Sequence, residues 1–184
     1  MEYRRAFIAI NLPEKVKKSI VESSTEWRNL PVNWTYEQNL HMTLLFLGDI
    51  TDDEISEIGK KISEVARRTE PFTIKFTEFV YGPKDFALTE RPRMIWLEGE
   101  ENENLAVLCD ELGNALQMGE RRKKFRPHIT VGRIHAGRGI GDFPKTLNKE
   151  LDASVQVASI ELMESELRSG KRHYGILLSA KFGV

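Results

Sequence analysis

The sequence reads His41-Met42-Thr43-Leu44-Leu45-Phe46 in its first half and Pro127-His128-Ile129-Thr130-Val131-Gly132-Arg133 in its second half. Both stretches carry a histidine and a threonine with one residue between them, and together they hold half of the four histidines in a chain of 184 residues. We therefore predict two similar structural units, each with one copy of the motif. If the units pack face to face, two imidazoles and two hydroxyls meet in one cleft and can perform acid–base chemistry at a phosphate without a metal.

The apolar residues around both motifs predict β-strands. Successive side chains of a strand point to opposite faces, so His41 and Thr43 share one face while Met42 and Leu44 share the other. The same parity separates the second histidine and threonine from Ile129 and Val131. Each strand thus offers one imidazole and one hydroxyl to a common face, and burying such a face without purpose would be costly.

Hydrophobic spacing and turn residues predict the remaining elements. Strands are expected near 4–11, 40–48, 72–76, 94–97, 127–134, 154–163 and 173–182. Helices are expected after Pro13, after the capping-box pattern Thr51-Asp52-Asp53-Glu54, near 102–118 and near 144–150. Because no glycine-rich phosphate loop joins a strand to a helix, we expect a mixed or antiparallel sheet with helices outside it.

Composition limits the other classes of function. The chain is 40% hydrophobic and 30% charged with a net charge of −1, so a binding site for a polyanion has to be a local patch. Cys109 is the single cysteine, which excludes an intramolecular disulfide and a four-cysteine metal site and favours a reducing cytoplasm. No apolar run is long enough to span a bilayer, so we expect a cytoplasmic protein without membrane association.

Arg133 is a candidate for neutralising charge on a phosphate, but its position raises a geometric difficulty. It lies three residues beyond Thr130, so strict alternation turns it away from the histidines. A bulge or strand end at Gly132 would re-aim it towards them. A regular ladder through 130–134 would exclude this role.

The two motifs and their flanks resemble the paired His-x-Thr motifs of the two-histidine phosphoesterase superfamily. Within it, the chain is most similar to the RNA 2′,3′-cyclic phosphodiesterases, also called 2′-5′ RNA ligases. The resemblance extends to Ala6-Phe7-Ile8-Ala9-Ile10, to Leu47-Gly48 after the first motif and to Phe125-Arg126-Pro127 before the second.

This resemblance implies an α+β fold with two pseudo-twofold-related lobes, formed by residues 1–184 as one bilobal domain. Each lobe would be a mostly antiparallel sheet with helices on its outer face, and the active-site cleft would lie between the sheets. The implied reaction is metal-independent opening of an RNA 2′,3′-cyclic phosphate to a 2′-phosphate, with no cofactor. The resemblance also implies, more weakly, reversible 2′-5′ joining of RNA ends. We expect a monomer whose partner is RNA with a 2′,3′-cyclic phosphate terminus.

Roles follow residue by residue from the matching motif positions. His41 and His128 would be the acid/base pair, and Thr43 and Thr130 would bind the phosphate together with Arg133. Because O3′ has to leave, one histidine should activate water while the other protonates O3′. Our working assignment makes His128 the base and His41 the acid.

Further RNA contacts are expected around the cleft. The basic run 121–126 leads into the second motif and offers Lys124, Phe125 and Arg126 to RNA, although a solvated loop would look the same. Trp34 could stack on a base or pack inside the protein. We expect Phe46 in the core, since it shares parity with Met42.

Three alternatives stay open at this point: a zinc site, a small-molecule substrate, and binding of RNA ends without catalysis. A zinc site is disfavoured because neither motif contains His-x-His, a nearby cysteine or a carboxylate at ligand spacing. His135 and His173 fit surface positions at strand ends. The substrate could instead be a small cyclic nucleotide derivative, or the cleft could bind RNA ends without catalysis, although binding has little need of two proton-exchanging groups.

Overall fold

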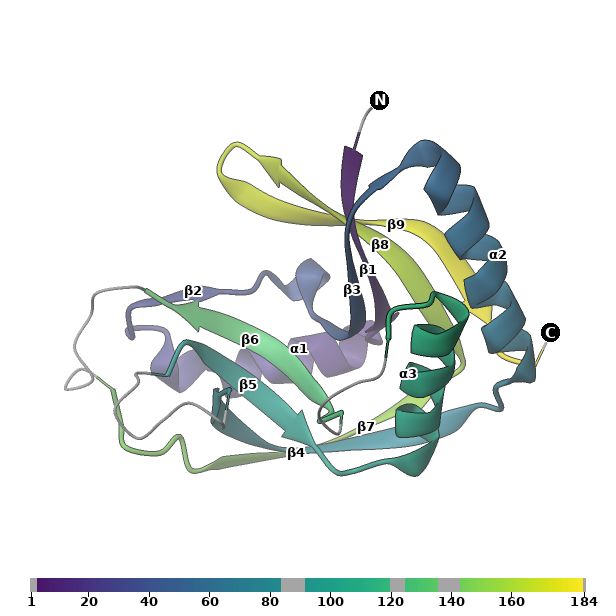
Figure 1. Cartoon of the computed structure of the whole chain (residues 1–184). Helices are drawn as coiled ribbons and strands as arrows, with labels where there is room; N and C mark the ends of the chain where they lie inside the picture. The colour runs from purple at the N-terminus through teal and green to yellow at the C-terminus, as the bar shows by residue number, and fades with distance from the viewer. Residues whose placement is uncertain (1–2, 84–91, 120–124, 136–142, 184) are drawn as a thin grey trace.

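Two antiparallel sheets form the centre of the computed structural model, which describes residues 3–83, 92–119, 125–135 and 143–183 (Figure 1). Sheet A contains, in spatial order, β3 (His41–Thr51), β1 (Tyr3–Asn11), β8 (Ser159–Arg168) and β9 (Lys171–Lys181). Sheet B contains, in spatial order, β2 (Val32–Trp34), β6 (His128–Ile134), β5 (Met94–Gly99), β4 (Phe72–Gly82) and β7 (Lys149–Val157). Each sheet carries one motif strand, and the expected α+β class with antiparallel sheets is confirmed.

The two sheets are not the two halves of the sequence. Strands β4 and β5 follow the first motif but pair in sheet B with each other, and β5 pairs with the second motif strand β6. Strands β8 and β9 follow the second motif but complete sheet A beside β1. Each sheet therefore combines strands from distant parts of the chain, because hydrophobic periodicity identifies strands but does not select their non-local partners.

Helices lie on the outside of the sheets. Helix α2 (Asp52–Arg68) packs along β9 and β8, α3 (Glu103–Ala115) lies beside α2, and α1 (Glu14–Ser23) contacts β7. Two 3-10 turns, η1 (Thr25–Trp27) and η2 (Glu37–Asn39), shape the chain between α1 and β3. In the part of the chain that the structure describes, no helix is long and apolar enough to cross a membrane.

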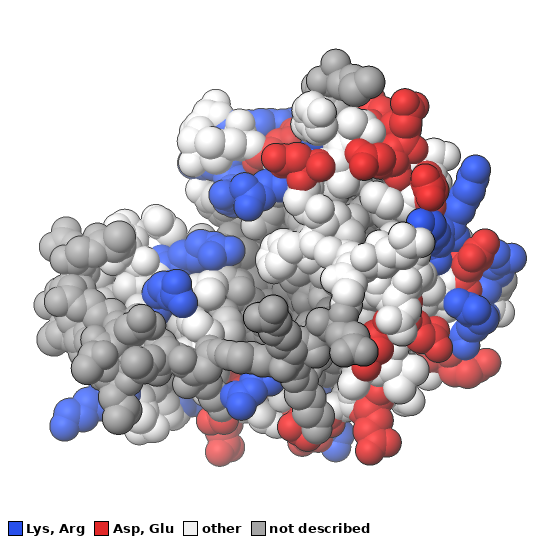
Figure 2. All heavy atoms as spheres, viewed as in Figure 1, with Lys and Arg blue, Asp and Glu red and all other residues white. Residues whose placement is uncertain are grey.

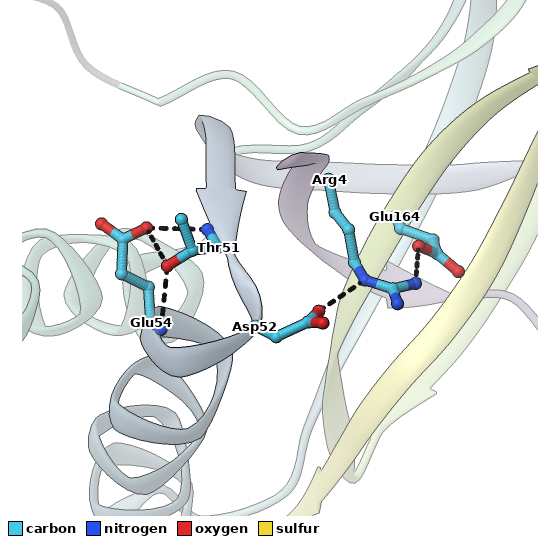
Figure 3. Close-up of polar contacts among 5 residues, drawn as sticks. All are labelled: Arg4, Thr51, Asp52, Glu54 and Glu164. Atoms are coloured by element: carbon cyan, nitrogen blue, oxygen red, sulfur yellow. Dashed lines mark hydrogen bonds and ion pairs between the residues drawn. The ribbon is translucent and has the colours of Figure 1, made fainter. Parts of the chain in front are cut away.

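The predicted capping box fixes the start of α2 (Figure 3). The Thr51 hydroxyl oxygen accepts from the Glu54 amide, and the Glu54 carboxylate accepts from the Thr51 amide at 2.7 Å. Beside it, Arg4 of β1 binds Asp52 at 2.8 Å and Glu164 of β8 at 2.9 Å. These contacts hold the first turn of α2 against two strands of sheet A, next to the end of the first motif strand.

The helix expected at 144–150 is absent, since β7 begins at Lys149 and residues 143–148 form no helix. Leu147 and Leu151 have a helical spacing, but residues 149–157 alternate between exposed and buried positions and pair with β4. The single strand expected at 154–163 is two strands that separate at Ala158.

One cluster of buried apolar side chains joins the two sheets. Ile8 and Met42 enter it from sheet A, and Ile95 and Ile129 enter it from sheet B. Strands β3 and β6 contact each other although they belong to different sheets. The core therefore brings the two motif strands together.

Candidate active site

His41 is held by its own strand and by the turn before it. Its Nδ1 lies 2.7 Å from the carbonyl oxygen of Asn39, and its Nε2 lies 2.9 Å from the Thr43 hydroxyl. A carbonyl oxygen only accepts, so Nδ1 carries a proton and donates it to Asn39. In the neutral ring Nε2 then has a lone pair, which accepts from the Thr43 hydroxyl. The atom available for proton transfer is Nε2.

His128 repeats this arrangement in sheet B. Its Nδ1 lies 2.8 Å from the carbonyl oxygen of Arg126, again two residues upstream of the histidine. The same tautomer follows, with Nε2 as the atom for proton exchange. Both imidazoles are thus oriented by the main chain of the residues that lead into their strands.

Strand parity places the motifs as expected. Met42, Leu44, Ile129 and Val131 are buried on the core side, whereas the histidines and threonines are half-buried on the opposite side. Aromatic rings support both imidazoles on that side. The ring centroids are 4.9 Å apart for Phe7–His41, 5.0 Å for Tyr174–His41 and 4.0 Å for Trp96–His128.

A β-bulge follows the threonine in each motif strand. In sheet A, Thr43 pairs with Ala9 and Leu45 with Ile8, so the register shifts by one residue at Leu44. In sheet B, Thr130 pairs with Trp96 and Gly132 with Ile95, which leaves out Val131. An extra residue shifts the alternation of side chains by one position. Each strand therefore changes face after its threonine.

The bulge at Val131 turns Arg133 to the side of His128 and Thr130. Arg133 is exposed, and its guanidinium lies 3.5 Å from the Met94 sulfur on the neighbouring strand. Gly132 permits this bend, since a Cβ there would lie 2.4 Å from a Val32 methyl group. The expected irregularity next to Gly132 is confirmed, one residue earlier than the glycine itself.

The expectation of a buried Phe46 is wrong. Its side chain is 70% exposed, and it pairs with Phe7, whose ring contacts that of His41. The bulge at Leu44 places Phe46 on the histidine face, just as its counterpart places Arg133 there. Aligning the two motifs position by position would have revealed this equivalence from the sequence.

Burial lowers the pKa of both histidines, because desolvation disfavours the charged imidazolium. The charges of Lys17, Arg133 and His128 lower the pKa of His41 further, while its bond to the Asn39 carbonyl raises it. At His128, the Arg126 carbonyl and the charge of Glu98 oppose the effect of burial. The charges of Arg133 and His128, both from β6, therefore reach the His41 imidazole on β3.

The remaining candidates are spread around this site. Trp34 packs beside Gly132, with the Arg28 guanidinium 5.0 Å from its ring centroid. Phe125 is half-buried against the core, Arg126 is exposed with its guanidinium 4.0 Å from Glu98, and Lys124 lies outside the described residues, as do 121–123.

His135 and His173 are exposed, as expected. Among the described residues, no three His, Cys, Asp or Glu side chains group as metal ligands would.

Comparisons with known proteins agree with this geometry. The family model of the 2′-5′ RNA ligase superfamily matches residues 16–168. The RNA 2′,3′-cyclic phosphodiesterase of Thermotoga maritima is 36% identical over 135 residues, which cover 71% of this chain and 70% of the relative. The enzyme of that name from Archaeoglobus fulgidus is 28% identical over 167 residues, covering 89% and 92%.

Solved structures show the same fold. The crystal structure of TT0787 of Thermus thermophilus has a TM-score of 0.83 at 26% identity, covering 97% of this chain and 98% of that one. Escherichia coli LigT, solved with NADP+, has a TM-score of 0.79 at 21% identity and covers all of both chains. With paired His-x-Thr strands and a family model matching most of its length, the chain belongs to the 2′-5′ RNA ligase superfamily.

Proposed function

We propose that this protein hydrolyses the 2′,3′-cyclic phosphate at RNA ends to a 2′-phosphate without a metal ion. The observation that carries the proposal is the matched pair of imidazoles, each with Nδ1 bound to a main-chain carbonyl, so that Nε2 is the nitrogen that exchanges protons. The names of the relatives, RNA 2′,3′-cyclic phosphodiesterase, support the substrate.

The reaction requires one proton acceptor and one proton donor. One imidazole removes a proton from water as the water oxygen bonds to phosphorus, and the P–O3′ bond breaks. The other imidazole protonates O3′, which leaves a free 3′-hydroxyl and a 2′-phosphate. The Thr130 hydroxyl donates to a non-bridging oxygen, and the Thr43 hydroxyl does so once it turns away from Nε2 of His41. Arg133 offsets the negative charge that develops on these oxygens.

The charges around the two imidazoles favour one assignment of the acid and the base. Glu98 stabilises the protonated form of His128, whereas Lys17 and Arg133 disfavour the protonated form of His41. We therefore favour His128 as the acid and His41 as the base, which reverses our working assignment from the sequence. A substrate with a better 3′ leaving group should then rescue His128→Ala and not His41→Ala. Rescue of His41→Ala alone would restore the original assignment.

The same chemistry accommodates 2′-5′ joining. If the 5′-hydroxyl of a second RNA replaces water, the same base and acid produce a 2′-5′ phosphodiester and the same free 3′-hydroxyl. We propose ligation as a second reaction of this site. It is tested by adding a 5′-hydroxyl RNA and looking for a product that carries a 2′-5′ linkage.

The test of hydrolysis is incubation of the purified protein with an RNA ending in a 2′,3′-cyclic phosphate in the presence of EDTA. We expect conversion to a 2′-phosphate end, which phosphatase treatment and mass spectrometry identify. Conversion only after metal is added would refute the mechanism. Tight binding of the RNA without any conversion would instead favour a non-catalytic RNA-end binding protein.

A further inference from the structure

A second recess lies beside the acid/base pair. It is a cavity of about 630 Å³ between the turn of the β8–β9 hairpin and the segment from β2 to η2, and neither imidazole lines it. The residues that matter for its chemistry are Trp34, Tyr36, Arg133, Lys171, Arg172 and Tyr174. In Figure 2, Lys and Arg side chains flank the hollow between this hairpin and the strands below it. The volume suits a ligand the size of a nucleotide.

The lining combines aromatic rings with cations. Tyr36 is 46% exposed, and the Lys171 ammonium lies 5.6 Å from its ring centroid. Arg28 stands over Trp34 in the same way, and Glu37 is the one acidic residue of the lining against four cationic residues. This positive excess is local, because the whole chain has a net charge of −1. Aromatic platforms beside backbone-neutralising cations are what single-stranded nucleic acids require.

The cavity is continuous with the acid/base pair. Arg133 lines the cavity and also acts on His41, and the Tyr174 ring packs on the His41 ring. Asn39 connects the two parts, because its carbonyl accepts from His41 while its side-chain amide donates to the Arg172 carbonyl at 2.8 Å. A chain that leaves the reacting phosphate on this side enters the cavity directly.

The covalent structure of the substrate decides which nucleotide reaches it. The terminal ribose is bonded to the reacting phosphorus through O2′ and O3′, so the terminal nucleoside has to lie over the imidazoles, where Phe46 is exposed. Because neither imidazole lines the cavity, the cavity suits the nucleotide that precedes the terminal one in the RNA.

We propose that this cavity binds the penultimate nucleotide of a single-stranded RNA, with its base on Tyr36 and the linking phosphodiester against Lys171 and Arg172. The proposal rests on the proposed function and narrows its substrate to RNA of at least two nucleotides. A mononucleoside cyclic phosphate would leave the cavity unused and would be a poorer substrate.

The test compares kcat/KM for uridine 2′,3′-cyclic phosphate and for a uridine dinucleotide with the same terminus. The wild type should prefer the dinucleotide, and Tyr36→Ala should lower kcat/KM for the dinucleotide about tenfold, mainly through KM, since stacking of one base contributes about 1–3 kcal/mol. Activity on the mononucleotide should stay unchanged. Tyr36→Phe keeps the ring and should keep the preference.

Two matched control variants change residues of sheet A that lie outside the cavity. Tyr3→Ala removes another exposed tyrosine, and Lys181→Ala removes an exposed lysine of the same strand as Lys171, so neither should change the preference. Lys171→Ala should weaken the preference and its dependence on salt.

The outcomes separate this proposal from the proposed function. Equal kcat/KM of the wild type on both substrates, or an equal loss on both in Tyr36→Ala, overturns the cavity proposal and leaves hydrolysis intact. Hydrolysis of neither substrate overturns the proposed function. In that case the affinity for a labelled 3′-phosphorylated dinucleotide is measured by fluorescence anisotropy. Weaker binding by Tyr36→Ala than by Tyr3→Ala supports the proposal that the cavity binds a nucleotide, and equal binding refutes it.

Discussion

The two motif histidines share one hydrogen-bond arrangement but differ in the charges around them. Each Nδ1 donates to the carbonyl two residues upstream, so Nε2 is the nitrogen that exchanges protons in both rings. Their burial favours the neutral imidazole, and only His128 has a carboxylate neighbour that counteracts it. A pair of this kind has both a proton acceptor and a proton donor only in a limited pH range.

The rate should therefore depend on pH in a bell-shaped manner that is displaced to the acidic side. Because the pKa of each histidine is lowered, both limbs of kcat/KM should lie below the ordinary imidazole pKa of about 6.5. Activity falls at higher pH because the acid has lost its proton, and falls at lower pH because the base has gained one. A value of kcat/KM that stays constant between pH 6 and 8 would contradict this account.

Arg133 should matter for the transition state more than for folding. Arg133→Met keeps an unbranched side chain but removes the cation, so we expect a loss of roughly 10²-fold or more in kcat with a small change in the melting temperature. Arg67→Met on α2 changes an arginine in the last turn of an outer helix and should leave kcat unchanged. Similar kcat values for Arg133→Met and the wild type would remove Arg133 from the mechanism.

The sequence predicts the faces of His41, Thr43, His128 and Thr130 because strand parity is a local property. Parity also predicts a buried Phe46, and there it fails, since the bulge at Leu44 reverses the faces beyond it. The second bulge could be anticipated from Gly132, but the first strand has no glycine at the corresponding position. Bulges depend on pairing with a neighbouring strand, which one segment does not specify.

At the scale of elements, α1 contributes an unexpected charge to the site. Lys17 is 3% exposed, with its ammonium 2.9 Å from Glu14, and its charge lowers the pKa of His41. The sequence predicts this helix from Pro13 and its apolar spacing. It does not predict the effect on His41, because α1 and the η2 turn before His41 meet only in the folded protein.

Lys17→Met should raise the pKa of His41, since removing a nearby positive charge makes protonation of the imidazole less costly. The titration of the His41 ring protons measured by NMR reports the shift, and the pH profile of kcat/KM should move in the same direction. Lys18→Met changes an exposed lysine next along α1 and should leave the titration where it is in the wild type. An unshifted His41 in Lys17→Met would show that the helix has no electrostatic role.

At the scale of the whole molecule, each sheet is assembled from strands that are far apart in the sequence. Sheet A receives β8 and β9 from the end of the chain, and sheet B receives β2 and β4 from the first half. The second motif strand β6 thus pairs with β2 from the first half, and β8 from the second half pairs with β1, the neighbour of the first motif strand. The sequence predicts the repeated motif. It does not predict which strands share a sheet, because pairing between distant segments is not encoded in the hydrophobic periodicity of either segment.

The proposed function requires that one imidazole from each sheet act in a single proton-exchanging pair. The decisive measurement is kcat/KM on an RNA 2′,3′-cyclic phosphate for His41→Ala, His128→Ala and the double variant. We expect a loss of roughly 10²–10⁴-fold in each single variant and little further loss in the double variant, because groups that act as a unit are not additive. Losses that multiply in the double variant, or near wild-type activity in either single variant, would contradict a shared mechanism.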